Sequence, residues 1–357
     1  MEHLFDPMKK MEDFGHENVY FFNDKATHLQ GIIAIHNTVL GPALGGTRLW
    51  TYANSFEALH DVLRLSRGMT YKSSAAGINL GGGKAVIIRH PEAKYDKAYW
   101  TRYGEFVERL GGNYITAADV GTKTEFMRHI ASSTSSVAGK PDDLGGGGDP
   151  SPVTAYGVYL GMKASAKKRY GNDGLEGKRV MVQGVGQVGR YLVGHLLKDG
   201  ADVLIADINE DNIKKTLALG SCQVVAPDTV YDQAMDIYAP CALGATLNEE
   251  TIPRLQCSIV AGGANNQLKD EIEDVKRLEA RDILYAPDFL INSGGVINCY
   301  IEVIGEYNRD KAFEGCERIY SRTEETLQYA STHGMSTHDA ALALAQERID
   351  QAKKLTE

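Results

Sequence analysis

The segment from Lys178 to Asp207 constrains the fold more than any other part of the chain. The apolar run Lys178–Gln183 leads directly into Gly184-Val-Gly-Gln-Val-Gly189, and a second apolar run, Asp202–Asp207, follows a helical pattern. Asp207 comes about 20 residues after the first glycine, as expected for an acidic residue that contacts a ribose. A lone glycine motif is weak, but this strand–glycine–helix–strand context predicts a dinucleotide-binding βαβ unit rather than an ordinary glycine turn.

Each glycine of the motif has a separate physical role. Gly184 permits the tight turn, Gly186 lets a pyrophosphate approach the backbone at a helix N-terminus, and Gly189 allows close packing of helix and strand. Asp207 can bind both ribose hydroxyls and would repel a 2′-phosphate. The predicted cofactor is therefore NAD rather than NADP.

Strand and helix patterns continue to alternate after this unit. Ile237–Pro240, Ser258–Ala261 and Ile283–Ala286 are short apolar runs with strand composition. Alternation of this kind predicts a parallel sheet. We therefore expect a Rossmann-type NAD-binding domain over residues 154–331, entered by a helix over 155–169.

The amino-terminal part of the chain has a mixed α/β pattern. The sequence predicts a helix around 100–110 and strands at 19–22, 31–36, 84–89 and 114–119. Ser55 is predicted to cap a helix whose buried face carries Leu59, Val62 and Leu63, at the spacing of a helical stripe. Asp119 would then stand at the carboxyl end of its strand.

Residues 141–152 carry the strongest loop signal in the sequence, because they include Gly145–Gly148 and three prolines. We expect a hinge loop at 141–153 in an α/β protein of two domains, with a cleft between them. The first domain, for substrate binding and oligomerisation, would comprise residues 1–140 and about 332–357. A final amphipathic helix over 337–354 is expected to pack back on that domain.

Composition narrows the class of protein. The 357 residues are 43% hydrophobic and 24% charged, as in a soluble globular protein large enough for two domains. A net charge of −9 argues against nucleic-acid and membrane partners, and the sequence shows neither a signal peptide nor a membrane span. The five cysteines are odd in number and lack the spacing of metal ligands. We expect reduced thiols, a cytoplasmic location and no metal.

Candidate catalytic residues gather around a glycine run. Gly81–Gly83 are predicted to form a loop in which the backbone passes close to a ligand, and Lys84 follows directly. Lys72 ends an apolar helix upstream, and Asp119 ends a strand that carries small residues. Each could instead be an ordinary surface residue, which is the common fate of lysine and aspartate. Together they favour a charge-handling site for a small polar substrate.

Longer motifs resemble the amino-acid dehydrogenase superfamily, which includes glutamate, leucine, valine and phenylalanine dehydrogenases. They occur in order along nearly the whole chain, and the leucine dehydrogenases are the most similar members. The motifs lie at Gly41–Arg48, Gly68–Lys72, Gly81–Lys84, Ala118–Gly121, Asp149–Gly157, Ala239–Gly244, Gly263–Gln267, Tyr285–Phe289 and Asn292–Val296.

The resemblance implies NAD-dependent, reversible oxidative deamination of an L-amino acid to a 2-oxo acid and ammonia. It assigns the α-carboxylate to Lys72, activation of the attacking water to Lys84, and proton transfer at the amino group to Asp119. Our hypothesis is that the neighbouring lysine lowers the pKa of Lys84, as a general base needs. The implied cofactor contacts are Thr154, Gly184, Val185, Gly186, Gln187, Val188, Gly189, Asp207, Cys241, Ala242, Asn265 and Asn292.

The residues around the substrate side chain decide which amino acid is oxidised. By resemblance they are Leu44, Ala117, Val296 and Cys299, and Gly45 and Asn266 also contact the substrate. The glutamate enzymes have a lysine at the position of Leu44, and burying an unpaired carboxylate here would cost roughly several kcal/mol. Leucine, valine or isoleucine is therefore predicted. Cys299 replaces the usual valine and Tyr300–Val303 also differs, so an aromatic substrate is the alternative.

The resemblance also implies a homo-oligomer, with the first domain as the interface. A non-catalytic, nucleotide-sensing Rossmann protein is the alternative from a different class. The presence of both Lys84 and Asp119 argues against that alternative, because a binding module has no need for the two residues.

Overall fold

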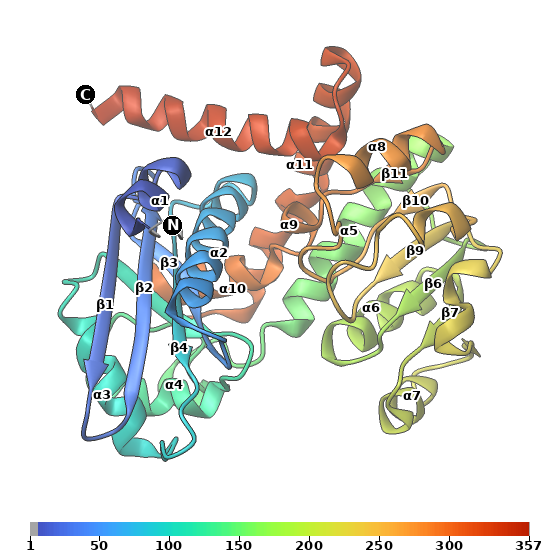
Figure 1. Ribbon diagram of the computed structural model, residues 1–357. Helices are drawn as coiled ribbons and strands as arrows, with labels where there is room; N and C mark the ends of the chain where they lie inside the picture. The colour runs from blue at the N-terminus through green and yellow to red at the C-terminus, as the bar shows by residue number, and fades with distance from the viewer. Residues whose placement is uncertain (1–5, 357) are drawn as a thin grey trace. The chain divides into compact units, whose positions relative to one another are not determined.

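The computed structural model describes residues 6–356, and the chain divides into two compact units (Figure 1). Unit 1 comprises the chain up to Asp149 together with Asn298–Arg309 and Ala345 onward. Unit 2 comprises Pro150–Ile297 and Asp310–Leu344. The chain leaves unit 1 inside the predicted hinge loop, but it returns twice, at 298 and 345, rather than once at about 332.

Unit 1 is built on a five-stranded mixed sheet in the order β1-β2-β4-β3-β5. The pairs β1–β2 and β2–β4 are antiparallel, whereas β3–β4 and β3–β5 are parallel. The predicted strands are present, and β3 is an additional central strand that the sequence analysis did not identify. The strands are β1 (Asn18–Asp24), β2 (Leu29–Asn37), β3 (Ala43–Trp50), β4 (Gly81–Ile88) and β5 (Tyr114–Ala118).

Helices cover both faces of this sheet. Ile33 and Ile35 of β2 belong to the core shared with α3 (Lys97–Glu108) and α4 (Thr124–Ile130). Ile32 and Ala34 belong to the core shared with α2 (Ser55–Ala75), to which α1 (Pro7–Phe14) contributes Met11 and Phe14. Successive side chains of a strand point to opposite faces, so a strand between two layers is apolar throughout. A short 3₁₀ turn, η1 (Asp142–Leu144), lies in the glycine-rich loop.

The glycine run expected to form a loop lies inside a strand. Gly81–Gly83 are the first residues of β4, and all three are buried. A Cβ on Gly82 would collide with the backbone nitrogen of Thr70 in α2, and one on Gly83 would meet the ring of Tyr114. The close approach that these glycines permit is therefore one of helix and strand. The loop prediction for this run is wrong.

The cap of α2 also differs from the prediction by one residue. Asn54, not Ser55, is the N-cap, and its side chain accepts hydrogen bonds from the amides of Phe56 and Glu57. Leu59, Val62 and Leu63 are buried as predicted. Asparagine and serine are comparable N-cap residues, so the sequence alone left two adjacent candidates.

Unit 2 is built on a six-stranded, wholly parallel sheet in the order β11-β10-β9-β6-β7-β8. From β6 the chain runs outward through β7 and β8, then returns to β9 and runs the other way. This is the doubly wound Rossmann arrangement, and the predicted fold class is confirmed. Its strands are β6 (Arg179–Gln183), β7 (Asp202–Ala206), β8 (Gln223–Val224), β9 (Ile237–Pro240), β10 (Ile259–Val260) and β11 (Leu284–Tyr285).

Helices connect these strands and then lead out of the sheet. The first is α5 (Ser151–Tyr170), which begins four residues before the predicted start at residue 155 because Pro152 is accepted in the first helical turn. The others are α6 (Gln187–Lys198), α7 (Glu210–Leu217), η2 (Pro227–Asp232), η3 (Ile252–Arg254), α8 (Glu273–Ala280), α9 (Asp288–Ile291), α10 (Gly294–Val303), α11 (Arg309–His333) and α12 (Thr337–Thr356).

The final helix returns to unit 1 in its second half. The hydroxyl of Ser74 donates to the carbonyl oxygen of Ala345 at 2.7 Å, and Arg348 donates to the carbonyl oxygen of Ile78 at 2.9 Å. The predicted packing of the tail on the first domain is therefore confirmed from Ala345 onward.

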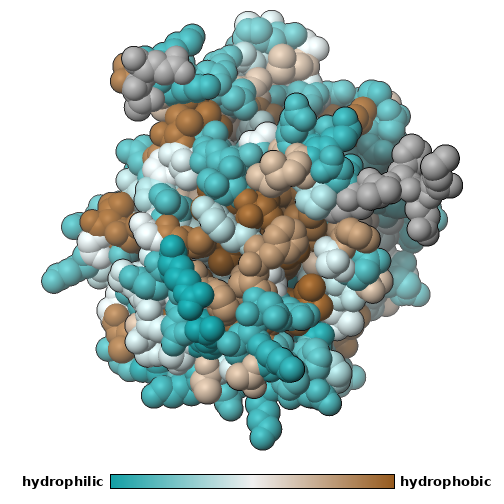
Figure 2. Space-filling view, turned by 60° about the vertical axis from the view of Figure 1, so that its left-hand side comes forward, coloured by the Kyte–Doolittle hydropathy of each residue, from teal (hydrophilic) through white to brown (hydrophobic). Residues whose placement is uncertain are grey.

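Within residues 6–356, none of the helices combines the length and apolar composition needed to cross a bilayer. Apolar side chains nevertheless appear on the surface as patches among hydrophilic ones (Figure 2). Two of them, Tyr20 and Phe21, lie on the edge strand β1 and are 36% and 61% exposed.

Candidate active site

Lys84 and Asp119 form a close ion pair in unit 1. Lys84 projects from β4 and is almost wholly buried, and Asp119 directly follows β5. Their Nζ and Oδ2 atoms are 3.0 Å apart, with side chains 7% and 22% exposed. A partly buried ion pair is screened less by solvent than a surface pair. The structure thus brings together the two residues predicted to be catalytic.

Arg48 of β3 is a second cation on Asp119, and the sequence analysis gave it no role. Its Nε lies 3.2 Å from Asp119 Oδ2, and its Nη1 lies 2.9 Å from Asp61 Oδ2. The hydroxyl of Tyr52 also donates to Asp61 Oδ2, at 2.8 Å. The available signal was the position of Arg48 at the end of a quoted motif, Gly41–Arg48.

Charge balance decides the protonation state of Asp119. Burial favours the neutral acid, but the charges and hydrogen bonds of Lys84 and Arg48 outweigh it and lower the pKa of Asp119. The main-chain amide of Asp119 donates to the hydroxyl of Thr122 at 2.8 Å, which fixes the backbone at this point. Asp119 is therefore held as a carboxylate in a fixed position.

Two glycines of β3 make room for this pair. A Cβ on Gly46 would lie 2.6 Å from the carbonyl oxygen of Ala118 and 2.9 Å from the Cβ of Asp119. A Cβ on Gly45 would collide with the carbonyl group of Gly83. Both glycines are needed because β4, β3 and β5 approach one another most closely here.

The other predicted substrate residues are divided between the units. Leu44 of β3 and Ala117 of β5 are buried in unit 1, and Lys72 is half-buried in the last turn of α2. Cys299 belongs to the part of α10 in unit 1, and burial raises the pKa of its thiol to about 12. Val296 and Asn266 belong to unit 2.

The glycine motif of unit 2 has the three properties that a pyrophosphate loop needs. Gly184 has φ +94°, and its missing Cβ would lie 2.6 Å from the Cβ of Ala242. A Cβ on Gly189 would collide with the carbonyl oxygen of Gly184, whereas one on Gly186 would meet nothing within 4 Å. Gly186 is the N-cap of α6, so the open space lies where free amides and the helix dipole favour an anion.

Asp207 holds the glycine loop from the end of β7. Its Oδ2 accepts a hydrogen bond from the amide of Val185 at 2.8 Å, and its Oδ1 accepts one from the amide of Asn209 at 2.8 Å. A carboxylate has about four lone-pair sites, so these two bonds leave acceptors for ribose hydroxyls. Asp207 can thus shape the loop and bind a ribose at once.

The loops that follow β9 and β10 interlock beside the glycine motif. The amide of Ala245 donates to the carbonyl oxygen of Asn266 at 2.7 Å, and both residues have positive φ angles. The amide of Gly263 donates to the sulfur of Cys241, whose pKa burial raises to about 12. Cys241 is therefore a packed, protonated thiol. The carboxyl ends of β6, β7, β9 and β10 form the edge where doubly wound sheets bind ligands.

Asn292 carries a buried acceptor that has no protein partner within the described chain. Its Nδ2 donates to Asn265 Oδ1 at 2.8 Å and lies 3.3 Å from the carbonyl oxygen of Gly263, while its Oδ1 is unpaired. An unpaired buried acceptor is costly and indicates a missing donor. Thr154 lies against Gly294 and Gly295, where added Cβ atoms would meet it. These features fit a dinucleotide with a carboxamide group.

Two family models together cover nearly the whole chain. Residues 16–136 match the Glu/Leu/Phe/Val dehydrogenase dimerisation domain, and residues 145–209 and 205–356 match Glutamate/Leucine/Phenylalanine/Valine dehydrogenase. The chain belongs to this family. It is therefore an amino-acid dehydrogenase, an oxidoreductase of a pyridine-nucleotide-dependent class.

The dehydrogenase is similar over its full length to characterised relatives. It is 50% identical to the leucine dehydrogenase of Thermoactinomyces intermedius over 98% of this chain and 94% of that protein. It is 47% identical to the leucine dehydrogenase of Bacillus subtilis (strain 168) over 97% and 94%. The crystal structure of L-tryptophan dehydrogenase from Nostoc punctiforme matches with a TM-score of 0.86 at 41% identity, over 97% and 99%.

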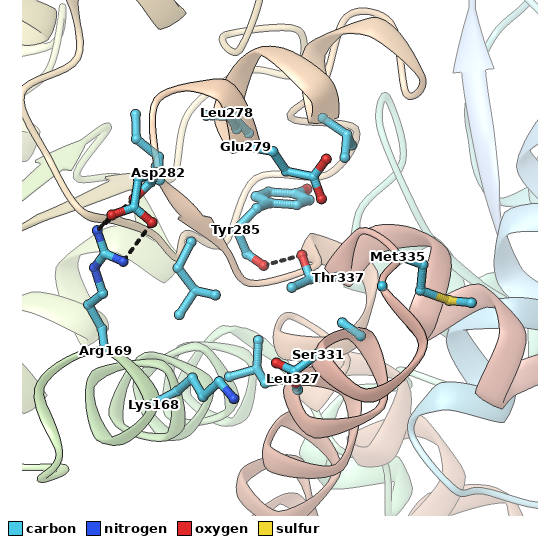
Figure 3. A pocket seen from close by; sticks show the side chains of 15 residues that line it. Lys168, Arg169, Leu278, Glu279, Asp282, Tyr285, Leu327, Ser331, Met335 and Thr337 are labelled. Atoms are coloured by element: carbon cyan, nitrogen blue, oxygen red, sulfur yellow. Dashed lines mark hydrogen bonds and ion pairs between the residues drawn. The ribbon is translucent and has the colours of Figure 1, made fainter.

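A separate cavity of about 390 Å³ lies within unit 2 of the dehydrogenase (Figure 3). On one wall Arg169 Nη2 pairs with Asp282 Oδ2 at 2.6 Å, and on another Thr337 donates to the carbonyl oxygen of Tyr285 at 2.6 Å. None of the predicted site residues lines it. We assign this cavity no part in the reaction.

Proposed function

We propose that the protein catalyses the NAD-dependent, reversible oxidative deamination of a branched-chain L-amino acid to the 2-oxo acid and ammonia. The observation that carries the proposal is the buried Lys84–Asp119 pair, because a cation and a carboxylate 3.0 Å apart can pass a proton between them. Sequence identity of 50% to a leucine dehydrogenase, over 98% of this chain, supports the substrate class.

NAD is the proposed form of the pyridine nucleotide. Its pyrophosphate would lie at Gly186 and the start of α6, and its ribose hydroxyls on Asp207. Its carboxamide would donate to the unpaired Oδ1 of Asn292. When bound, NAD supplies the acceptor for the hydride that leaves the substrate Cα.

Residues of unit 1 would handle the amino acid itself. Lys72 would pair with the α-carboxylate. The positively charged Lys84 would orient the attacking water and stabilise the charge that develops on its oxygen. Asp119, held ionised by Lys84 and Arg48, would take a proton from the substrate ammonium group and release it to solvent. It would then take the proton that the attacking water loses and deliver it to the nitrogen that leaves as ammonia.

An apolar side chain is the proposed specificity. Leu44 is 2% exposed and carries no charge, so it could not pair with the side-chain carboxylate of an acidic substrate. Leucine, valine and isoleucine differ by methyl groups, which shift preference in an apolar site by only ~1–3 kcal/mol.

An aromatic amino acid is the second candidate substrate. The specific observation in its favour is the 44% identity to an L-tryptophan dehydrogenase of Nostoc punctiforme over 98% of this chain. The chemistry would be the same, and only the residues around the substrate side chain would differ.

The test is NADH formation measured by absorbance with leucine, valine, isoleucine, phenylalanine, tryptophan and glutamate in parallel. We expect the highest kcat/KM with a branched-chain substrate and negligible turnover of glutamate. A larger kcat/KM with phenylalanine or tryptophan would replace the first candidate by the second. No NADH with any of the six would overturn the function itself.

A homo-oligomer in the cytoplasm is the proposed form of the enzyme. The exposed Phe21 and Tyr20 on the edge strand β1 support assembly through unit 1, since unpaired strand edges and exposed apolar side chains favour association. The five cysteines are free thiols, as in proteins of a reducing compartment. Light scattering of the purified enzyme tests the assembly.

A further inference from the structure

Two imidazoles and a carboxylate converge at the end of the unit 1 sheet, away from every residue discussed above. His28 lies in the turn between β1 and β2, and His90 and Glu92 lie in the segment after β4. One nitrogen or oxygen atom from each residue lies within 4.8 Å of the other two. His28 is far in the sequence from His90 and Glu92, so spacing alone could not reveal the cluster, and the sequence analysis expected no metal.

Both segments that carry these side chains are held by hydrogen bonds. In the β1–β2 turn, Asp24 accepts from the amide and hydroxyl of Thr27 at 3.0 and 2.7 Å, and from Arg102 of α3 at 3.0 Å. After β4, the main-chain amide of His90 donates to the hydroxyl of Tyr95 at 3.0 Å. The backbones beneath the cluster are therefore fixed before any ligand arrives.

His28 has an unusual backbone conformation for a side chain of its size. Its φ is +56°, in the left-handed region that glycine adopts without strain and that most other residues avoid. Such a backbone outlier supports a hypothesis of function at this turn.

The side chains lie together without satisfying one another. The rings of His28 and His90 stack with centroids 4.6 Å apart, and His28 Nε2 lies 3.8 Å from Glu92 Oε2, beyond hydrogen-bond length. Two imidazoles and one carboxylate are the donor set of a three-ligand zinc site. In tetrahedral zinc with bonds of ~2.0–2.1 Å the ligand atoms are about 3.3 Å apart, so no pair of ligand atoms must close by more than about 1.5 Å.

We infer that His28, His90 and Glu92 bind one zinc ion, with water in the fourth position. The ion fastens the β1–β2 turn to the segment after β4. His28 and Glu92 are 40% and 72% exposed, so their side chains can rotate toward the ion at little cost. His90 gives up the hydrogen bond that its Nδ1 accepts from the Glu92 amide, or turns its ring, and either change lowers the affinity for the ion.

The test is titration of the full-length enzyme with zinc chloride by calorimetry, with thermal unfolding as a second readout. The diagnostic variant is His28→Gly, because glycine suits the positive φ and removes a ligand without adding strain. Glu92→Gln removes the charged ligand. His333→Gln removes an exposed imidazole in α11 and is the matched control.

We expect one zinc ion per chain, and a rise in the unfolding midpoint of the wild type and of His333→Gln. Binding should weaken at least about tenfold in His28→Gly and Glu92→Gln, with kcat on the amino acid unchanged in all variants. Magnesium chloride should not compete, because a nitrogen-rich site disfavours that ion. Zinc binding that is equally tight in His28→Gly, or absent from the wild type, overturns the inference.

Discussion

The two oxygens of Asp119 have different surroundings. Lys84 Nζ and Arg48 Nε both contact Oδ2, at 3.0 and 3.2 Å. Within the described chain, Oδ1 has no hydrogen-bond partner among the protein groups. The cations thus keep the group ionised through one oxygen, and in the proposed mechanism the other oxygen would receive the proton of the substrate ammonium group.

Replacing Asp119 by asparagine should remove the proton carrier while keeping the shape. We expect kcat to fall by ~10²–10⁴-fold, as for loss of a general acid–base group, with a much smaller change in Asp61→Asn, which contacts Arg48 from its other side. Steady-state kinetics measure both. Equal losses in the two variants would show that charge around Arg48 matters rather than proton transfer.

The pH dependence of Asp119 has a defined sign. Its pKa is lowered in the folded enzyme, so its ion pairs contribute stability above the ordinary aspartate pKa of ~3.9 and lose it as the pH falls through the folded pKa. Asp119 should therefore stay ionised throughout the neutral range. An acidic limb in the kcat profile near neutrality would have to come from another group.

Residue identity in this site was predictable only in part. Lys84 and Asp119 stand next to glycines and small residues, a visible signal in a single sequence. Arg48 had only the weaker signal of its place at the end of the motif Gly41–Arg48, and an arginine near a strand end is usually a solvated surface group. The fold makes it a partly buried partner of Asp119 by bringing the end of β5 beside β3.

At the level of elements, the start of α2 gives a direct test of the corrected cap. Asn54→Ala should lower the free energy of unfolding by ~1 kcal/mol, because two helix amides lose their acceptor. Ser55→Ala should change it little, since that hydroxyl caps nothing. Urea unfolding of the two variants decides the matter, and a larger loss in Ser55→Ala would restore the cap first predicted.

Glu302 anchors the glycine-rich loop of unit 1 from α10. Its side chain is 2% exposed, and Oε2 accepts hydrogen bonds from the amides of Gly139 and Gly147, both at 2.9 Å. Lys140 adds an ion pair at 3.5 Å. One carboxylate therefore binds both ends of the segment 139–147, most of which belongs to the predicted hinge loop.

Truncating Glu302 should destabilise that segment selectively. In Glu302→Ala two amides lose a charged acceptor, so we expect a loss of ~2–3 kcal/mol in unfolding free energy and faster proteolysis within residues 139–148. Glu306→Ala, an exposed glutamate nearby, is the control. Cleavage at the same rate in both variants would remove Glu302 from this role.

Elements were predictable where one pattern dominated. The short apolar runs of the parallel sheet were found, because a strand covered on both faces is apolar throughout. β3 was missed because Gly45 and Gly46 interrupt its apolar pattern. The glycine run of β4 was assigned to a loop because its reason is tertiary: Gly82 meets α2 and Gly83 meets Tyr114. These neighbours are distant in the sequence, so the residues around the glycine run could not predict them.

On the scale of the whole molecule, the partly buried His16 and the buried His36 should make stability depend on pH. His16 Nε2 contacts the hydroxyl of Ser66 at 2.7 Å, and His36 Nδ1 contacts that of Thr70 at 2.8 Å. Burial, and then nearby positive charge, lowers the pKa of His16 to about 3. Burial first and the charge of Arg67 also lower the pKa of His36, to about 4.

Acid should therefore unfold the protein through these two groups. Above the unfolded pKa of ~6.5 both states are neutral and the full stability is present. Between pH 6.5 and about 4, His16 and His36 bind protons in the unfolded chain but not in the folded chain, so the free energy of unfolding falls. Urea midpoints at pH 7.5, 6 and 5 should decline, and decline less in His16→Gln than in His333→Gln. Parallel declines would assign the effect elsewhere.

The contact between Gly82 and α2 has a consequence for how an enzyme of this kind could change its substrate. The main chains of α2 and β4 are in direct van der Waals contact there. The distance between the helix bearing Lys72 and the strand bearing Lys84 is therefore set mainly by the backbone and not by replaceable side chains. All L-amino acids share one separation between carboxylate and Cα. If Lys72 and Lys84 act as proposed, this fixed distance would match the constant part of the substrate, while exchangeable side chains such as Leu44 and Cys299 would follow the part that varies.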